Sequence, residues 1–449
     1  MNIFRFLPGI LRNKIEGRDE LKKITVNFSW LFADKMVRLL LGLLVNVLLA
    51  RYLGPDQFGL WNYGIAFVTI FSPIANLGLN NILVRDLVTT PEQKDTLIGS
   101  AFVLKLVGGL VATIAAVVVM VFLRPGEDTI LFIVALTSSA YIMQSFDSID
   151  LFFQSQYKSK FTVIAKNVGF VSTSLVKILM VYLKADLMVF VWLSLLEIAI
   201  GSVFLIVAYK ANKHQLRKWR YHAQTAKRLV KDSWPLILSG FSIYTQAYID
   251  QVMLGDMVSD AEVAQYSVAM KLVSMFAFIP MIIQSSVAPE ITRAKQISED
   301  LYYMKLKMVY QIMFIVFLAI AVPIFFFSEN IIIILYGHEY EAAGYLLSLF
   351  AIRLLFTNFG TAKGLFITND NLFRYALIVA ATGAIANISA NLILIPLFAS
   401  KGALYASIIS FGITTFVIDA LYFKTRRNFK AMMLAMFDFK SYLKLIKKG

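Results

Sequence analysis

The stretch that decides the fold is NFSWLFADKMVRLLLGLLVNVLLARYLGPDQFGLWNYGIAF, residues 27–67. Its first part contains a mainly apolar run over 39–50, and a Leu-Gly-Pro turn at 53–55 separates this run from a second apolar segment. A helix needs about 20 mostly apolar residues to cross the roughly 30 Å hydrocarbon core of a bilayer. The stretch therefore predicts two consecutive membrane-spanning helices joined by a short polar turn.

Apolar runs of this kind recur along the whole chain. Of its 449 residues, 59% are hydrophobic and 16% are charged, with a mean hydropathy of +0.70. Soluble domains are about 45–50% apolar and about 25% charged. We therefore predict an all-α integral membrane protein with about 12 transmembrane helices in two six-helix bundles around a central cavity. The expected spans are 24–53, 58–81, 97–123, 128–155, 161–184, 186–210, 232–256, 263–289, 303–327, 344–367, 373–398 and 402–423.

The positions of the basic residues predict the orientation of these helices. The connection from Lys210 to Lys231 carries eight basic residues and no acidic one. The opposite loops and their flanks carry only four: Arg51, Arg124, Lys184 and Lys401. Because cytoplasmic loops are enriched in Lys and Arg, we expect a multi-pass protein with both termini in the cytoplasm. The formal net charge of +15 is spread over many short loops, which argues against a nucleic-acid partner.

The same basic connection divides the chain into two halves. The segments LARYLGPDQFGLWNYGIA (49–66) and DQVMLGDMVSDAEVAQYSVA (250–269) each leave the first helix of a half through Leu-Gly and a short polar turn. Duplicated halves of secondary transporters pack around a binding site near the membrane midplane. The predicted domains are an uncleaved cytoplasmic segment (1–23), a six-helix half (24–210), a basic cytoplasmic linker (211–231), a second six-helix half (232–423) and a basic cytoplasmic tail (424–449).

Charged side chains within the expected spans mark candidate functional residues. Each costs at least ~2.5–3.5 kcal/mol at the centre of a helix, so each needs a partner, a wet cavity or a function. The cations on these helices exceed the acids expected at similar depth, chiefly Asp250 and Glu197. We therefore predict a cationic cavity that binds an anionic ligand. The predicted substrate-binding residues are Arg38, Asp250, Lys271, Arg353 and Lys177.

Structural roles for these charges stay open beside the functional ones. Asp250 and Lys271 fall at similar depths on consecutive helices and could form an ion pair, and Asp34 could pair with Arg38 or Lys35. Tyr244 and Tyr248 lie next to Asp250 in the sequence and are weaker candidates. Four charges near cytoplasmic span ends are expected to extend toward water: Lys105, Lys166, Lys363 and Asp419.

Motifs for enzymatic chemistry are absent from the sequence. There is no cysteine, only three histidines, and no GxxxxGK[ST], HExxH or GxSxG pattern. We therefore predict no metal site and no catalytic residue. A membrane-embedded glycosyl polymerase stays open as an alternative, although the longest expected outer loop, 328–343, is short for a catalytic domain.

Three segments carry a resemblance to a known family: residues 27–67, DLFFQSQYKSKF (150–161) and IDQVMLGDMVSDAEVAQYSVAMKL (249–272). They resemble the polysaccharide-transporter family, which includes Wzx-type flippases of O-antigen and capsule repeat units. This family lies within the multidrug/oligosaccharidyl-lipid/polysaccharide exporter superfamily. The resemblance implies a flippase that moves an undecaprenyl-pyrophosphate-linked oligosaccharide across the bacterial inner membrane by alternating access. Its implied partners are the lipid-linked oligosaccharide, membrane lipids, a polysaccharide polymerase and a chain-length regulator.

The resemblance also assigns roles to residues inside the matching segments. It implies substrate contacts for Asp250 and Lys271, and it makes Arg51, Asp150 and Gln154 candidates for a gate or a helix-end contact. No cofactor is implied, and coupling to H⁺ or Na⁺ is open. A cation-coupled multidrug exporter of the same superfamily is the nearest alternative, but it would be expected to have an acidic cavity.

Overall fold

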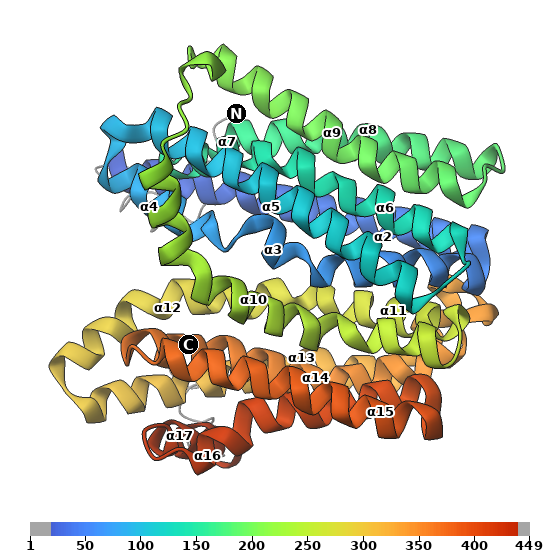
Figure 1. The fold of residues 1–449 in the computed structure, drawn as a ribbon. Helices are drawn as coiled ribbons and strands as arrows, with labels where there is room; N and C mark the ends of the chain where they lie inside the picture. The colour runs from blue at the N-terminus through green and yellow to red at the C-terminus, as the bar shows by residue number, and fades with distance from the viewer. Residues whose placement is uncertain (1–18, 439–449) are drawn as a thin grey trace. The chain divides into compact units, whose positions relative to one another are not determined.

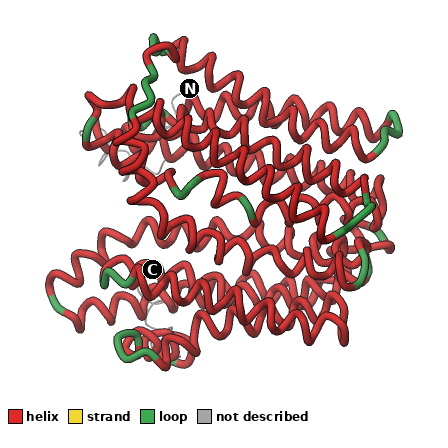
Figure 2. Tube along the Cα trace, in the orientation of Figure 1, coloured by secondary structure: helices red, strands yellow, loops and turns green. Residues whose placement is uncertain are grey.

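The computed structural model describes residues 19–438, and every regular element in that range is a helix (Figures 1 and 2). The chain folds into two compact units. Unit 1 contains residues 19–52 and 68–241 of the described chain, and unit 2 contains residues 53–67 and 242–438. The predicted all-α fold is confirmed. The predicted domain boundaries stay a prediction, and the expected segments 1–23 and 424–449 lie partly outside the described residues.

Within unit 1 the helices lie side by side, and α8 packs along much of α9 (Figure 1). Its elements are the first part of α2 (Asp19–Ile70), α3 (Ser72–Asn76), α4 (Leu79–Thr89), η2 (Pro91–Gln93), α5 (Lys94–Leu123), α6 (Asp128–Met143), η3 (Gln144–Phe146), α7 (Asp147–Ser155), α8 (Ser159–Tyr182), α9 (Leu187–Ala211), η4 (Leu216–Lys218) and the first part of α10 (Ala223–Met257). The short 3₁₀ turn η3 interrupts the predicted span 128–155. Such interruptions often mark functional positions.

Unit 2 is built in the same way, with α13 and α14 as its most extensively packed pair. Besides residues 53–67 of α2 and the end of α10, its elements are α11 (Asp260–Ser274), η5 (Met275–Ala277), α12 (Phe278–Ile297), α13 (Glu299–Tyr336), η6 (His338–Tyr340), α14 (Ala342–Asn369), α15 (Phe373–Gly412), η7 (Ile413–Val417), α16 (Ile418–Leu421) and α17 (Arg426–Phe437). The element η7 is a π-helix. Ser259 and Ser298 begin α11 and α13 by accepting hydrogen bonds from Glu262 N and Leu301 N.

Nine helical stretches within residues 19–438 are long and apolar enough to cross a membrane. Two of them, Ser29–Ile70 with 42 residues and Phe373–Leu421 with 49, are at least twice as long as one crossing requires. Both contain a backbone break, at Gly54 with φ 70° and at Ala399 with φ 48°. The predicted span 232–256, inside α10, is not among the nine. The predicted count of twelve therefore stays a prediction.

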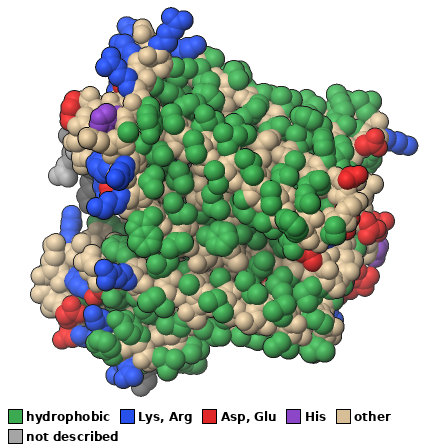
Figure 3. Space-filling view, in the orientation of Figure 1, with side chains coloured by type: hydrophobic (Ala, Val, Ile, Leu, Met, Phe, Trp, Pro, Cys, Tyr) green, Lys and Arg blue, Asp and Glu red, His purple; other side chains and the backbone are tan. Residues whose placement is uncertain are grey.

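The helices expose large apolar side chains that water would not accommodate. Phe122 is 80% exposed, and Phe326 and Ile334 are each 73% exposed. On the face drawn in Figure 3, hydrophobic side chains cover the middle of the helices and charged side chains gather at their ends. Soluble monomers rarely expose apolar patches of this extent. The protein is a multi-pass membrane protein.

Candidate functional site

Asp250 is the most deeply buried acid among the predicted site residues. It lies on α10 with no exposed surface. One carboxylate oxygen accepts a hydrogen bond from the Tyr266 hydroxyl on α11 at 2.5 Å, and the other accepts one from Asn391 Nδ2 on α15 at 2.8 Å. A buried carboxylate is tolerated only when hydrogen-bonded or paired. Neutral donors on two other helices hold this one.

The surroundings of Asp250 are rich in oxygen. Asn391 also donates to Asn387 Oδ1 at 3.2 Å, whereas its own Oδ1 is buried without a hydrogen-bond partner. Ser407 on α15 is fully buried beside Tyr266. Hard cations such as Na⁺ bind carboxylate, amide and hydroxyl oxygens, and a proton would neutralise the same carboxylate. We call Asp250, Tyr266, Asn387, Asn391 and Ser407 the Asp250 cluster.

Arg353 is a buried cation that forms no ion pair within the described residues 19–438. It is 9% exposed on α14, and its guanidinium stacks at 4.5 Å from the Phe411 ring centre and 5.6 Å from that of Phe350. Within residues 19–438 the guanidinium makes no hydrogen bond or ion pair. It lies close enough to Asp250 for an electrostatic effect on that carboxyl. Its N–H donors are thus available to an anionic ligand.

Lys271 and Asp250 contact different residues. Lys271 Nζ donates to Asn62 Oδ1 at 2.8 Å and lies 5.1 Å from the centre of the Phe58 ring, both within unit 2. Asp250 has the neutral partners described above. The predicted alternative of a structural Asp250–Lys271 ion pair therefore receives no support from these contacts.

In unit 1 the predicted binding cations are paired with acids. Arg38 Nε lies 3.0 Å from Asp34 Oδ1, which also accepts from Asn167 at 2.7 Å. Lys177 Nζ lies 3.3 Å from Glu197 Oε2. The expected surplus of positive charge is therefore not found around these two residues, because acids on the same or the neighbouring helix neutralise them.

The expectation that four charges extend toward water is wrong for Lys105, Lys363 and Asp419, which are buried, whereas the Lys166 side chain is 33% exposed. Lys105 is 2% exposed, and its Nζ donates to Asn80 Oδ1 at 2.8 Å. Lys363 and Asp419 form a buried ion pair within unit 2. Lys166 pairs with two acids in unit 1, as described next. Each charge has a partner within its own unit, which is cheaper than reaching the membrane surface.

The three gate candidates, Asp150, Gln154 and Arg51, all lie in unit 1. Asp150 accepts from Gln154 Nε2 at 3.0 Å and from Lys166 Nζ at 2.8 Å, so these side chains tie α7 to α8. Arg51 lies exposed on α2, three residues before the break at Gly54. Tyr244 and Tyr248 stack with ring centres 6.3 Å apart on α10. Their functional roles stay predictions.

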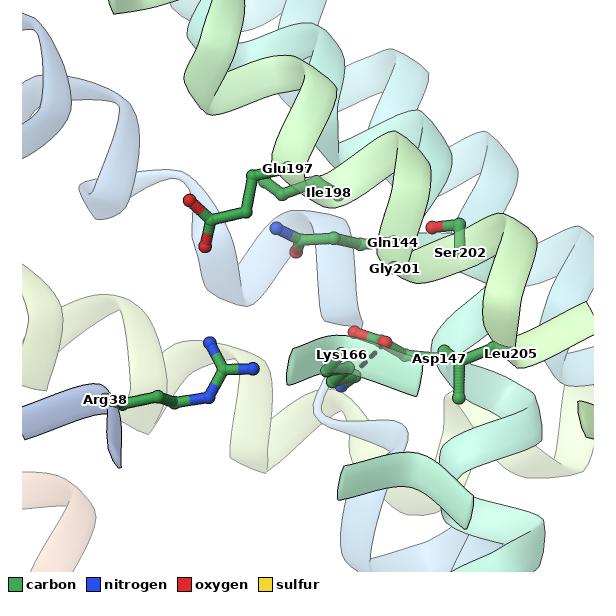
Figure 4. A pocket seen from close by; sticks show the side chains of 9 residues that line it. All are labelled: Arg38, Gln144, Asp147, Lys166, Glu197, Ile198, Gly201, Ser202 and Leu205. Carbon is green, nitrogen blue, oxygen red and sulfur yellow. Dashed lines mark ion pairs between the residues drawn. The ribbon is translucent and has the colours of Figure 1, made fainter. Parts of the chain in front are cut away.

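A cavity of about 220 Å³ lies within unit 1 (Figure 4). Arg38 from α2, Gln144 from η3, Asp147 from α7, Lys166 from α8 and Glu197 from α9 border it. The ion pair between Lys166 Nζ and Asp147 Oδ1, 2.9 Å long, forms part of its wall. Sequence reasoning missed Gln144, because a polar residue at a helix interruption carries no pattern of its own.

The comparison with known families decides the family. The profile of the polysaccharide biosynthesis protein family matches residues 24–295, which is more than half of the chain. The chain belongs to the polysaccharide biosynthesis protein family. This confirms the predicted resemblance to polysaccharide transporters. Among curated proteins, none matches this family member in sequence.

Three solved structures that share this fold are those of transporters or flippases. An inward-facing multidrug resistance MATE transporter of the MOP superfamily matches with a TM-score of 0.66 at 14% identity, covering 90% of this chain and 98% of that one. Lipid II flippase MurJ, in an inward closed conformation, matches with a TM-score of 0.65 at 14% identity, covering 92% and 91%. A MOP-superfamily transporter from Pyrococcus furiosus, described as having a binding pocket of reverse polarity, matches with a TM-score of 0.59 at 13% identity, covering 92% and 96%. These likenesses establish the fold of this polysaccharide biosynthesis protein.

A close contact at Gly169 packs α8 against α9 beside the unit 1 cavity, and it gives a testable prediction. A Cβ on Gly169 of α8 would lie 2.5 Å from the Glu197 carbonyl oxygen of α9, whereas one on Gly201 would meet nothing closer than 3.8 Å. Gly169→Ala should therefore separate the two helices at a cost of about 1–3 kcal/mol, while the control Gly201→Ala should leave stability nearly unchanged. Thermal unfolding of the two purified variants measures the difference. Equal melting temperatures would contradict the packing.

Proposed function

We propose that this protein is a flippase that moves an undecaprenyl-pyrophosphate-linked oligosaccharide repeat unit from the inner to the outer leaflet of the bacterial inner membrane. The family supports a role in polysaccharide synthesis, and the fold is that of MOP-superfamily transporters. A lipid-linked sugar is too polar to cross hydrocarbon unaided, because each unpaired polar group costs several kcal/mol there. A protein with polar residues inside a shell of apolar helices lowers that cost. We propose no catalytic step.

The observation that carries this proposal is Arg353. A guanidinium presents five N–H donors in a planar fork that matches phosphate oxygens in bidentate fashion. Arg353 is buried, is oriented by Phe350 and Phe411, and leaves that fork without a protein acceptor among residues 19–438. A pyrophosphate would supply the missing oxygens. Lys271, also in unit 2, is proposed as a further substrate contact.

Coupling of transport to H⁺ or Na⁺ is proposed at the Asp250 cluster. Its carboxylate joins α10 to α11 and α15 through Tyr266 and Asn391, so its occupancy bears on how these helices pack. An ion that binds one arrangement of the helices more tightly than another shifts the population toward that arrangement. The electrostatic effect of Arg353 on Asp250 would make ion binding and pyrophosphate binding interdependent.

Cation-coupled multidrug export is the second candidate function. The observation that favours it is the fold shared with MATE transporters, together with a buried acid at Asp250. A cationic drug, however, would meet the unpaired positive charge of Arg353 in the same unit. We therefore rank it below the flippase.

For the flippase, the polysaccharide polymerase and the chain-length regulator are proposed as partners. O-antigen or another surface polysaccharide is proposed as the product.

Variants of Arg353 test the proposal in bacteria. Arg353→Ala should lower surface polysaccharide by ten- to hundredfold, because a charge-assisted contact contributes about 1.5–3 kcal/mol. Arg353→Lys should restore only part of it, since a single ammonium cannot reproduce the bidentate fork. Surface polysaccharide per amount of membrane protein is measured, together with lipid-linked repeat units accumulating inside. Normal polysaccharide in Arg353→Ala, or increased sensitivity to cationic drugs instead, would contradict the flippase.

The proposed location in the inner membrane carries a prediction about sidedness. The chain has no native cysteine, so single thiols can be introduced cleanly. A cysteine at Val258, which is 43% exposed before α11, should react with a membrane-impermeant maleimide in spheroplasts. One at Gln224, in the basic linker region, should react only after the membrane is opened. The reverse pattern would overturn the orientation.

A further inference from the structure

We infer that the cavity in unit 1 is a binding subsite for one uncharged sugar residue, separate from the anion-binding Arg353 of unit 2. This inference rests on the proposed function and assigns a part of the same substrate. Figure 4 shows the Arg38 guanidinium, the Gln144 amide and the Glu197 carboxylate directed toward the cavity from three different elements. Of the predicted substrate-binding residues, only Arg38 lines this cavity.

The cavity has no surplus of positive charge, because the acids of the ion pairs around it outnumber the cations by one, and this distinguishes it from an anion site. The ion pairs of this region are Arg38 with Asp34 at 3.0 Å, Lys166 with Asp147 at 2.9 Å, and Lys177 with Glu197 at 3.3 Å. Asp150 gives Lys166 a second acid at 2.8 Å. An anionic ligand would gain no net attraction here and would still lose its hydration. A neutral ligand loses far less hydration free energy when it enters the cavity.

The polar atoms left over after this pairing are both donors and acceptors. Arg38 uses Nε for Asp34, which leaves its two terminal nitrogens as donors. Glu197 uses Oε2 for Lys177 and Thr173, which leaves Oε1 as an acceptor. The Gln144 amide makes no side-chain hydrogen bond with any residue in 19–438, so both its oxygen and its nitrogen are available. Sugar hydroxyls donate and accept at once and match such a mixed set.

The framework holds these atoms in fixed places. Gln144 begins the 3₁₀ turn between α6 and α7, and Asp147 follows at the first residue of α7. The close approach at Gly169 fixes α8 against α9 at Glu197. A site on rigid elements loses little entropy when a ligand binds.

The size of the cavity limits its ligand to a single small group. Its volume of about 220 Å³ lies below the roughly 300–1,000 Å³ typical of pockets for drug-sized ligands. One pyranose ring is therefore the unit that we assign to it, and not a whole repeat unit. Discrimination between neutral and acidic sugars would then occur in unit 1, and retention of the pyrophosphate in unit 2.

Thiol protection in the purified full-length protein tests the subsite. Ile198 lines the cavity without contributing a polar group, so Ile198→Cys reports access while leaving the polar set intact. Neutral hexoses and N-acetylhexosamines, titrated as free sugars, should slow its reaction with a small water-soluble maleimide, by about tenfold at about ten times the Kd. Glucuronate should protect less at the same concentration. The control Gln224→Cys should show no protection.

A second variant separates a real site from general crowding. Gln144→Ala, added to Ile198→Cys, removes no side-chain hydrogen bond from the described structure and should weaken protection by about two- to tenfold. The inference is overturned if no neutral sugar protects, if glucuronate protects better, or if Gln144→Ala changes nothing. Sugar protection in a protein that does not flip substrate would refute the proposed function alone. Flipping without sugar protection would refute the subsite alone.

Discussion

Replacing Asp419 with alanine is expected to remove most of the folded protein from the membrane. Asp419 is completely buried and pairs with Lys363, which is 3% exposed. The same carboxylate accepts hydrogen bonds from Tyr375 and Asn428. Alanine would leave a buried ammonium without its counter-charge, at a cost of about 3–5 kcal/mol. Total stabilities are only about 5–15 kcal/mol, so this loss is large.

The amount of monodisperse protein extracted from membranes measures this effect. The matched control is Asp300→Ala, whose partner Arg427 is half exposed, and it should change little because exposed pairs contribute little. Adding Lys363→Met to Asp419→Ala should recover part of the loss, since it removes the unpaired charge. Normal amounts of the single variant would show that the pair does not stabilise the fold.

Asp250→Asn is expected to abolish export without changing the amount of protein. Asparagine is nearly isosteric, and its carbonyl oxygen can still accept from Tyr266 or Asn391. It cannot bind or release a proton, and it offers a cation no charge. If the Asp250 cluster couples transport to an ion, surface polysaccharide should fall by ten- to hundredfold per protein, the size of a lost charge-assisted contact.

Two companion variants interpret this result. Asp250→Ala should lower abundance as well, because it leaves the buried Tyr266 and Asn391 donors unsatisfied, at about 1–3 kcal/mol each. Glu262→Gln, outside the cluster and able to keep its hydrogen bond from Ser400 N, should export normally. Export by Asp250→Asn at the wild-type level, with unchanged dependence on the H⁺ and Na⁺ gradients, would exclude coupling at this residue.

The general fold followed from the sequence because it depends on local patterns. Apolar runs of membrane-spanning length and the Leu-Gly-Pro turn at 53–55 predicted helices and a break, and the structure places the break at Gly54. Which charges pair could not be predicted in the same way. Lys363 lies on α14 and Asp419 on α16, and the sequence does not show how these two helices pack against each other.

The prediction of a cationic cavity was limited in the same way, because it could not take into account which charges pair across helices. Counting depth along single helices placed Arg38 and Lys177 among surplus cations, but α8 and α9 pack closely enough to bring Glu197 to Lys177. Within residues 19–438, the guanidinium of Arg353 lies over the rings of Phe350 and Phe411 and makes no ion pair, and its role in binding stays a prediction. Pairing across helices depends on rotation and packing, which hydropathy does not encode.

Translocation by the purified protein in liposomes tests the central claim most directly. An undecaprenyl-pyrophosphate-linked oligosaccharide is placed in the inner leaflet, and a lectin added outside records its arrival there. The flippase proposal predicts lectin binding that grows with time, requires the protein and falls strongly with Arg353→Ala. Folded wild-type protein that leaves the oligosaccharide inside, while transporting a cationic dye, would contradict it and would favour the multidrug exporter.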